Sequence, residues 1–154
     1  MTLTSEEMKG IIDKFQCELE IYTGLRDLSR GQMTVIDREA GPEELLEILG
    51  RKQVLINELE GLERELRPFK EEWSRVRESL PGEVRTQIEQ VVRNMQAVLA
   101  ELLELEEEGR TKLQQRQEQV AAKIREIGRS RQAHHAYAAG QTRPAKTGVI
   151  DNTG

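Results

Sequence analysis

The sequence has very few aromatic residues and only one cysteine. Aromatic side chains make up 3% of the 154 residues, and Cys17 is the single thiol. One cysteine excludes an internal disulfide and a cysteine-based metal cluster within this chain. The neighbours Phe15 and Leu19 are apolar, and no base is close in the sequence. We therefore expect Cys17 to pack as a small hydrophobic residue rather than to act as a nucleophile.

Strand signals and long apolar runs are also missing. No window alternates apolar and polar residues with period two, and β-branched residues are sparse. No stretch approaches the roughly 20 apolar residues that a membrane span needs. The first 15 residues have no basic segment followed by an apolar one, so a signal peptide is not expected. We expect a soluble, cytoplasmic protein without a membrane span.

Catalytic and metal-binding motifs are absent from the sequence. It contains no HExxH, no CxxC and no glycine-rich phosphate loop. His134 and His135 are adjacent, so on a helix they would point about 100° apart, and we interpret them as a polar pair at a fraying helix end. The glutamates around Leu102 and Leu105 fall mostly outside the apolar positions, unlike the inward-facing acids of di-iron bundles. We expect no enzymatic activity, no cofactor and no metal site.

What the sequence does contain is charge and helical periodicity. Charged residues make up 33% of the chain, and good helix formers dominate. The apolar spacing predicts three long helices, at about residues 4–38, 42–80 and 82–133, joined by short connections. The predicted fold is all-α, an elongated antiparallel three-helix hairpin or bundle with coiled-coil-like packing. It would form one helical domain over residues 1–137, followed by a flexible, disordered tail at 138–154.

The first predicted helix is apolar on two sides. The segment "TSEE" at Thr4–Glu7 reads as a capping box that starts it. A helix with two apolar stripes must be covered on two sides, so we expect it to lie between other helices. One stripe comprises Met8, Ile11, Phe15, Leu19, Tyr22 and Met33, and the other Cys17, Ile21, Leu25, Leu28 and Val35.

The second predicted helix repeats apolar residues in heptads over residues 45–80. Lys52 occupies one of these seam positions, and we expect its stem to pack while its ammonium reaches out to solvent. Pro68 lies inside the run and would cost about 3 kcal/mol in a helix interior. Because the repeat continues across Pro68 without a slip, the sequence predicts a kink there rather than a loop.

The C-terminal part of the third predicted helix is basic. Between Arg110 and Lys146 there are nine Lys and Arg residues and only two acidic residues, Glu118 and Glu126. The net charge of the whole chain, in contrast, is −5. Tyr137 is the only aromatic residue after Trp73, and readers of nucleic acid usually interleave aromatics with basic residues, so no nucleic-acid partner is expected. An apolar stripe continues through Leu113, Val120, Ile124 and Ile127. It could pack back on the bundle, dimerise or bind a partner helix, and the sequence leaves these alternatives open.

The overall layout resembles the FlgN-type flagellar export chaperones over about residues 10–140. The similarity rests on the two-sided first helix, the long third helix, the element from Tyr137 to Gly140, and a Leu-rich linker. The linker residues that carry it are Leu45, Leu46, Leu49, Lys52, Gln53, Leu55, Ile56 and Leu59. The resemblance implies a cytoplasmic, non-enzymatic chaperone of type III flagellar export. Such proteins bind helical terminal segments of hook-filament junction proteins, prevent premature assembly and deliver them to the export gate.

If the chain belongs to this family, the stripe on the third helix is our candidate client-binding site. Its expected residues are Leu113, Arg116, Val120, Lys123, Ile124 and Ile127. Arg116, Lys123 and Arg125 could steer an acidic client, and Tyr137, by similarity of position, would help to dock on the export gate. The alternative function is a structural coiled-coil or adaptor protein that self-associates, for example as a dimer, through its helical seam.

Overall fold

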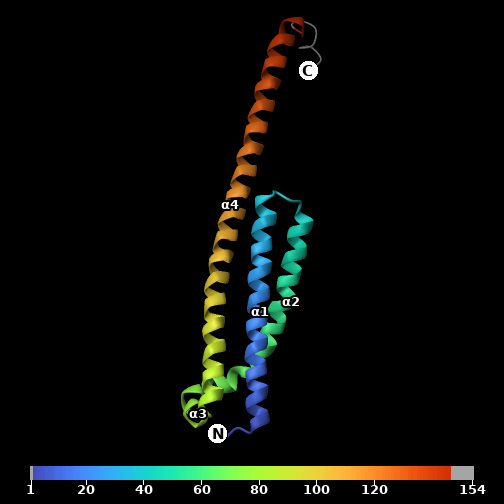
Figure 1. The fold of residues 1–154 in the computed structure, drawn as a ribbon. Coiled ribbons are helices and arrows are strands. Elements are labelled where there is room, and N and C mark those ends of the chain that lie inside the picture. Colours follow the sequence, from blue (N-terminus) through green and yellow to red (C-terminus); the bar gives the residue numbers. More distant parts are fainter. Residues whose placement is uncertain (1, 147–154) are drawn as a thin grey trace. The chain divides into compact units, whose positions relative to one another are not determined.

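The computed structural model describes the backbone of residues 2–146 and the side chains of residues 2–140, and this part of the chain is all-helical. It contains four helices and no strand: α1 (Ser5–Asp37), α2 (Pro42–Glu71), α3 (Trp73–Ser79) and α4 (Gly82–Lys146), as Figure 1 shows. The all-α prediction is therefore confirmed. The chain divides into two compact units, Met1–Thr111 and Lys112–Gly154, whereas the sequence predicts one helical domain over residues 1–137.

The ends of α1 follow the sequence signals closely. The Thr4 hydroxyl accepts a hydrogen bond of 3.1 Å from the Glu7 amide, which is the N-cap contact of a capping box, and it donates one to the Glu7 carboxylate. At the other end the Ala40 amide donates to the Val35 carbonyl, and Glu39 lies in the left-handed region at φ 53°. This left-handed residue lets the chain reverse, so that α1 and α2 lie side by side (Figure 1).

The buried face of α1 differs from both predicted stripes. It combines Phe15 of one stripe with Ile21 and Leu25 of the other, and it includes polar residues. The buried residues of α1 are Phe15, Glu18, Ile21, Leu25, Ser29, Gln32, Val35 and Ile36. Cys17 is exposed, so the prediction that it packs is wrong. Cys17 lies about 80° around the helix from Leu25, at an edge of the buried face, where Phe15 and Val35 are nevertheless buried; burial there depends on the neighbouring helices and not on the position around α1 alone.

The second predicted helix is divided in two. The helix continues through Pro68 to Glu71, so there is no loop at Pro68, as predicted. It ends at Glu72 (φ −93°, ψ 3°) and begins again at Trp73, so the prediction of one helix to residue 80 is wrong. Pro68 has no amide hydrogen for the carbonyl four residues before it, which weakens the last turns of α2. Figure 1 shows α3 turning away from the line of α2. This turn brings Val76 into the same core as Phe69.

The first unit has two apolar clusters along its helices. The larger cluster joins residues of all four helices: Phe15, Leu66, Phe69, Val76, Leu80, Ile88, Val91 and Met95. The rings of Phe15 and Phe69 meet edge to face at 5.9 Å between centroids, which is a favourable aromatic geometry. The smaller cluster joins Ile21 and Leu25 of α1 to Leu102 of α4.

The last helix is longer than the sequence predicts. We expect it to end near Ala133, but α4 extends to Lys146 and includes residues 138–146 of the predicted flexible tail. Alanines at 136, 138 and 139 are strong helix formers, so the single Gly140 does not stop the helix. Residues 147–154 of the predicted tail lie outside the described range. None of the described helices is apolar enough over a sufficient length to cross a membrane.

Candidate functional site

The six predicted client-binding residues all lie on α4, in the second unit. At about 100° per residue, Leu113, Ile124 and Ile127 fall within about 40° of Val120. Arg116 and Lys123 lie on one edge of the same face, within about 60° of Val120. The structure therefore places these residues on one helical face. We call this set, Leu113, Arg116, Val120, Lys123, Ile124 and Ile127, the α4 stripe.

The apolar centre of the α4 stripe is exposed. Val120, Ile124 and Ile127 have 51%, 63% and 50% of their surface accessible. Leu113 and Arg116 are half-buried, and Lys123 is exposed. Single exposed aliphatic residues are common on protein surfaces, but neighbouring ones on one helical face form a patch that fits a partner. The α4 stripe is thus available for contact with another apolar surface.

The same face continues beyond the stripe as a shallow hollow with both polar and apolar lining residues. It is lined by Ile127, Ser130, Arg131, His134, His135 and Ala138. Arg131 lies four residues after Ile127 and about 20° from Val120, so it is on the stripe's own face. Sequence reasoning missed Arg131, although its spacing could have found it. His134 and His135 lie inside α4 and not at a fraying end, so the predicted helix end near residue 133 is wrong for them as well.

Two other predicted residues lie off this face. Arg125, which we expect to steer a client, is about 140° around the helix from Val120. Tyr137, the predicted export-gate residue, is exposed and about 100° from Val120. The α4 stripe and Tyr137 therefore occupy different sides of the helix, and Arg125 does not belong with Arg116 and Lys123.

The first unit contains a buried lysine cluster that the sequence only partly indicates. The Lys52 ammonium donates a hydrogen bond of 3.0 Å to the Gln32 side-chain oxygen and is paired with Glu106. The Ser29 hydroxyl donates to the same Glu106 carboxylate at 2.6 Å. Lys52 is buried, so the prediction that its ammonium reaches solvent is wrong. Burial would raise the pKa of Glu106, but the hydrogen bonds from Lys52 and Ser29 lower it below its ordinary value.

A second polar cluster surrounds Glu18, which has no accessible surface. The Lys70 ammonium donates to one Glu18 oxygen at 3.2 Å and lies 3.1 Å from the other, which accepts no hydrogen bond. Lys70 also donates to Glu63 at 2.9 Å. Burial, reinforced by the neighbouring Glu63, raises the pKa of Glu18 to about 7 against the opposing effect of Lys70. Hydrogen bonding with Glu18 lowers the pKa of Glu63.

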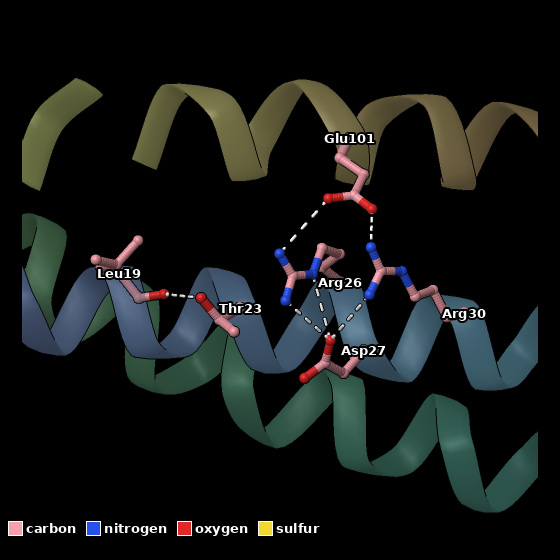
Figure 2. Close-up of polar contacts among 6 residues, drawn as sticks. All are labelled: Leu19, Thr23, Arg26, Asp27, Arg30 and Glu101. Atoms are coloured by element: carbon pink, nitrogen blue, oxygen red, sulfur yellow. Dashed lines mark hydrogen bonds and ion pairs between the residues drawn. The ribbon is translucent and has the colours of Figure 1, made fainter. Parts of the chain in front are cut away.

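The exposed edge between α1 and α4 carries a third set of charges. Figure 2 shows Glu101 of α4 facing both Arg26 and Arg30 of α1. The Arg26 and Glu101 charged atoms are 3.5 Å apart. On its other side, the Arg26 guanidinium lies 3.2 Å from a carboxylate oxygen of Asp27. Such pairs at the surface orient helices but add little stability.

The charged groups described above in the first unit are paired with one another. Glu18 is inaccessible to any substrate. Beside it lies an apolar pocket of about 250 Å³, lined by Phe15, Phe69, Lys70, Trp73, Ile88, Val92 and Met95. The ammonium of Lys70 in this pocket is in contact with the carboxyl groups of Glu18 and Glu63. Among the described residues, no cluster of three or more His, Cys, Asp or Glu side chains could hold a metal ion.

Comparisons with protein-family models, curated proteins and solved structures found no match to this chain. The α4 stripe remains the candidate site, because it was predicted from the sequence and its apolar centre is exposed in the structure.

Proposed function

We propose that this protein is an export chaperone of the FlgN type that binds a helical terminal segment of a hook-filament junction protein. It holds that segment on the α4 stripe, prevents premature assembly and delivers the client to the flagellar export gate from the cytoplasm. The observation that carries the proposal is the exposure of Val120, Ile124 and Ile127 on one face of α4.

The physical basis is the pairing of two amphipathic helices. A segment that will later pack in an assembly exposes an apolar stripe before it reaches its partners. A chaperone helix with exposed aliphatic residues at spacings of three and four can cover that stripe as a surrogate neighbour. Leu113, Val120, Ile124 and Ile127 supply the apolar contact, and Arg116 and Lys123 lie at its edge.

The remaining parts of the chain have separate roles in this proposal. Unit 1 is the scaffold, an antiparallel arrangement of three long helical segments with coiled-coil-like packing. Tyr137 contacts the export gate. Because Tyr137 is about 100° around α4 from Val120, the client and the gate contact different sides of the helix.

A structural coiled-coil or adaptor protein is the second candidate. The spacing from Leu113 to Val120, Ile124 and Ile127 is seven, four and three residues, as in the seam of a coiled-coil dimer. In that case the α4 stripe would bind the same stripe of a second copy. Light scattering across a range of protein concentrations separates the two functions, because a structural dimer persists on dilution without a client.

The direct test uses the full chain with Val120→Asp and Ile124→Asp combined. We expect this variant to retain its helical circular dichroism and to lose client binding at least tenfold, since a charge is placed in the apolar contact. The clients are the terminal segments of hook-filament junction proteins from the same organism, measured by fluorescence anisotropy. The matched control is Gln115→Asp with Ala122→Asp, on the opposite face of α4. Equal client binding by both variants would refute the proposed site.

A further inference from the structure

Over residues 113–131, the face of α4 that bears the stripe carries positive charge only. Arg116, Lys123 and Arg131 lie within about 60° of Val120. The two acidic residues of this segment, Glu118 and Glu126, lie at least about 120° away from Val120, on the other side of the helix. Cations therefore occur along the whole face of this segment, while the two glutamates of the segment lie on the other side of the helix.

Within the described part of the chain, no carboxylate neutralises these three cations. In the described range, Arg116, Lys123 and Arg131 form no ion pair, unlike Arg26 and Arg30 of the first unit, which both face Glu101. They extend over about 22 Å of helix, at 1.5 Å per residue. Lys123 and Arg131 are exposed and Arg116 is half-buried. A partner seated on the stripe would meet all three charges at the edges of an apolar contact.

A second copy of this chain is a poor match for the same face. Two α4 stripes packed against each other would bring six cations, three from each copy, and no carboxylate of this face into one interface. Like charges across an interface oppose association and select against that partner. The chemistry that complements the face is an apolar stripe bordered by carboxylates.

We propose, resting on the proposed function, that the client is an acidic amphipathic helix. Its aliphatic residues cover Val120, Ile124 and Ile127, and its Asp and Glu side chains flank Arg116 and Lys123. One acidic end lies over the hollow formed by Ile127, Arg131 and the two histidines. The charge pattern of α4 thus selects among amphipathic helices, which an apolar stripe alone does not do.

The test uses two synthetic helical peptides of about 20 residues, long enough to populate a helix. Both peptides have the same apolar positions; one carries Glu and the other Lys at every flanking position. Affinity for the full chain is measured by fluorescence anisotropy at low and high salt. We expect the Glu peptide to bind at least tenfold more tightly at low salt. The advantage shrinks in about 0.5 M salt, because screening weakens exposed charge pairs.

Charge variants then test which residues make the selection. Arg116→Glu, Lys123→Glu and Arg131→Glu combined should reverse the preference in favour of the Lys peptide. The control is Arg125→Glu with Arg129→Glu on the opposite face of α4, which should leave the preference unchanged. Circular dichroism checks that both variants stay helical.

Failure of this inference is distinct from failure of the proposed function. If both peptides bind equally and Val120→Asp with Ile124→Asp removes both, helix binding stands and charge selection is overturned. If neither peptide binds, or binding survives that double variant, the α4 stripe is not a helix-binding site and the proposed function fails. If the chain instead forms oligomers that the triple charge variant dissolves, the occupant is a second copy and the acidic client is overturned.

Discussion

The Lys52 ammonium on α2 donates a hydrogen bond of 3.0 Å to the side-chain oxygen of Gln32 on α1. The same ammonium is paired with Glu106 on α4, whose carboxylate also accepts a hydrogen bond from Ser29. One lysine thus connects three helices of the first unit at a seam position that is usually apolar. A satisfied polar group in a helical seam fixes the register of the helices around it.

Removing this ammonium should destabilise the first unit. Lys52→Ala leaves the buried Gln32 oxygen without its donor and Glu106 without its cation. We expect the free energy of unfolding to fall by about 1–3 kcal/mol, the usual cost of a stranded buried polar group. Urea unfolding followed by circular dichroism measures the loss. Lys52→Met keeps the packed stem and separates lost packing from lost hydrogen bonding. Wild-type stability in both variants would contradict a role for the ammonium.

The buried carboxyl of Glu18 should make stability depend on pH near neutrality. Its pKa is raised to about 7 in the folded protein from about 4.5 in the unfolded chain. Between these values the folded state holds a proton that the unfolded state has released. The contribution of Glu18 is therefore complete below about pH 4.5 and is lost as the pH rises to about 7. We expect stability to decline over this window, by at most about 1.4 kcal/mol per pH unit for one proton.

The measurement is urea unfolding at a series of pH values for the wild type, Glu18→Gln and Glu20→Gln. Glu18→Gln cannot titrate at this position, so its pH slope should be flatter than that of the wild type. Glu20 is an exposed neighbour on α1, and its variant should keep the wild-type slope. The comparison uses the slope of stability against pH and not the stability itself, because the amide introduced by Glu18→Gln also changes the contact with Lys70. Equal slopes in all three proteins would mean that Glu18 does not hold the proton.

Helical periodicity was enough to predict the fold class, and the capping signal at Thr4–Glu7 was enough to predict the start of α1, because both depend on local sequence. The periodicity was not enough to predict the polar residues of the buried face. Glu18, Ser29 and Gln32 are buried, and each has a hydrogen-bond partner on another helix: Lys70, Glu106 and Lys52, respectively. A pattern that counts apolar residues assigns such positions to the surface. The break at Glu72 was missed for a related reason, since the proline that weakens the helix lies four residues earlier.

The candidate site was predictable in its residues but not in its exposure. The spacing of Leu113, Val120, Ile124 and Ile127 defines one face wherever the chain is helical. The same spacing occurs in Leu66 and Phe69, which are buried. Whether an apolar stripe is covered depends on the other helices, and a local pattern does not contain that information. Arg131 was missed because the apolar pattern stops at Ile127.

Two glycines inside helices should respond differently to alanine. A methyl group at Gly50 meets no atom within 4 Å, whereas one at Gly24 lies 3.1 Å from a methyl carbon of Leu55. We expect Gly50→Ala to raise the free energy of unfolding by about 0.5–1 kcal/mol through helix propensity. Gly24→Ala should gain less or lose stability, because Leu55 must shift. Thermal unfolding of both variants makes the comparison, and an equal gain would show that α1 and α2 are not closely packed at Gly24.

The charges in Figure 2 should contribute little to stability, and their contribution should depend on salt. Glu101→Gln removes the carboxylate that faces Arg26 and Arg30. Because these groups are partly exposed, we expect a loss below about 1 kcal/mol at low salt. The loss should shrink in about 0.5 M NaCl, where charges at this distance are screened. A larger loss that salt does not change would indicate that Glu101 acts through packing.

Two aliphatic side chains of similar size should separate the core from the α4 stripe. Leu66 is 1% exposed in the main cluster, and Ile124 is 63% exposed on α4. Leu66→Ala removes buried methyl groups and leaves a cavity, so we expect a loss of about 2–5 kcal/mol in the free energy of unfolding. Ile124→Ala loses little burial and gains helix propensity, so its stability should stay within about 0.5 kcal/mol of the wild type. Urea unfolding of both variants gives the comparison. A large loss from Ile124→Ala would mean that the stripe is packed in the native protein, and a client could then bind there only by displacing what covers it.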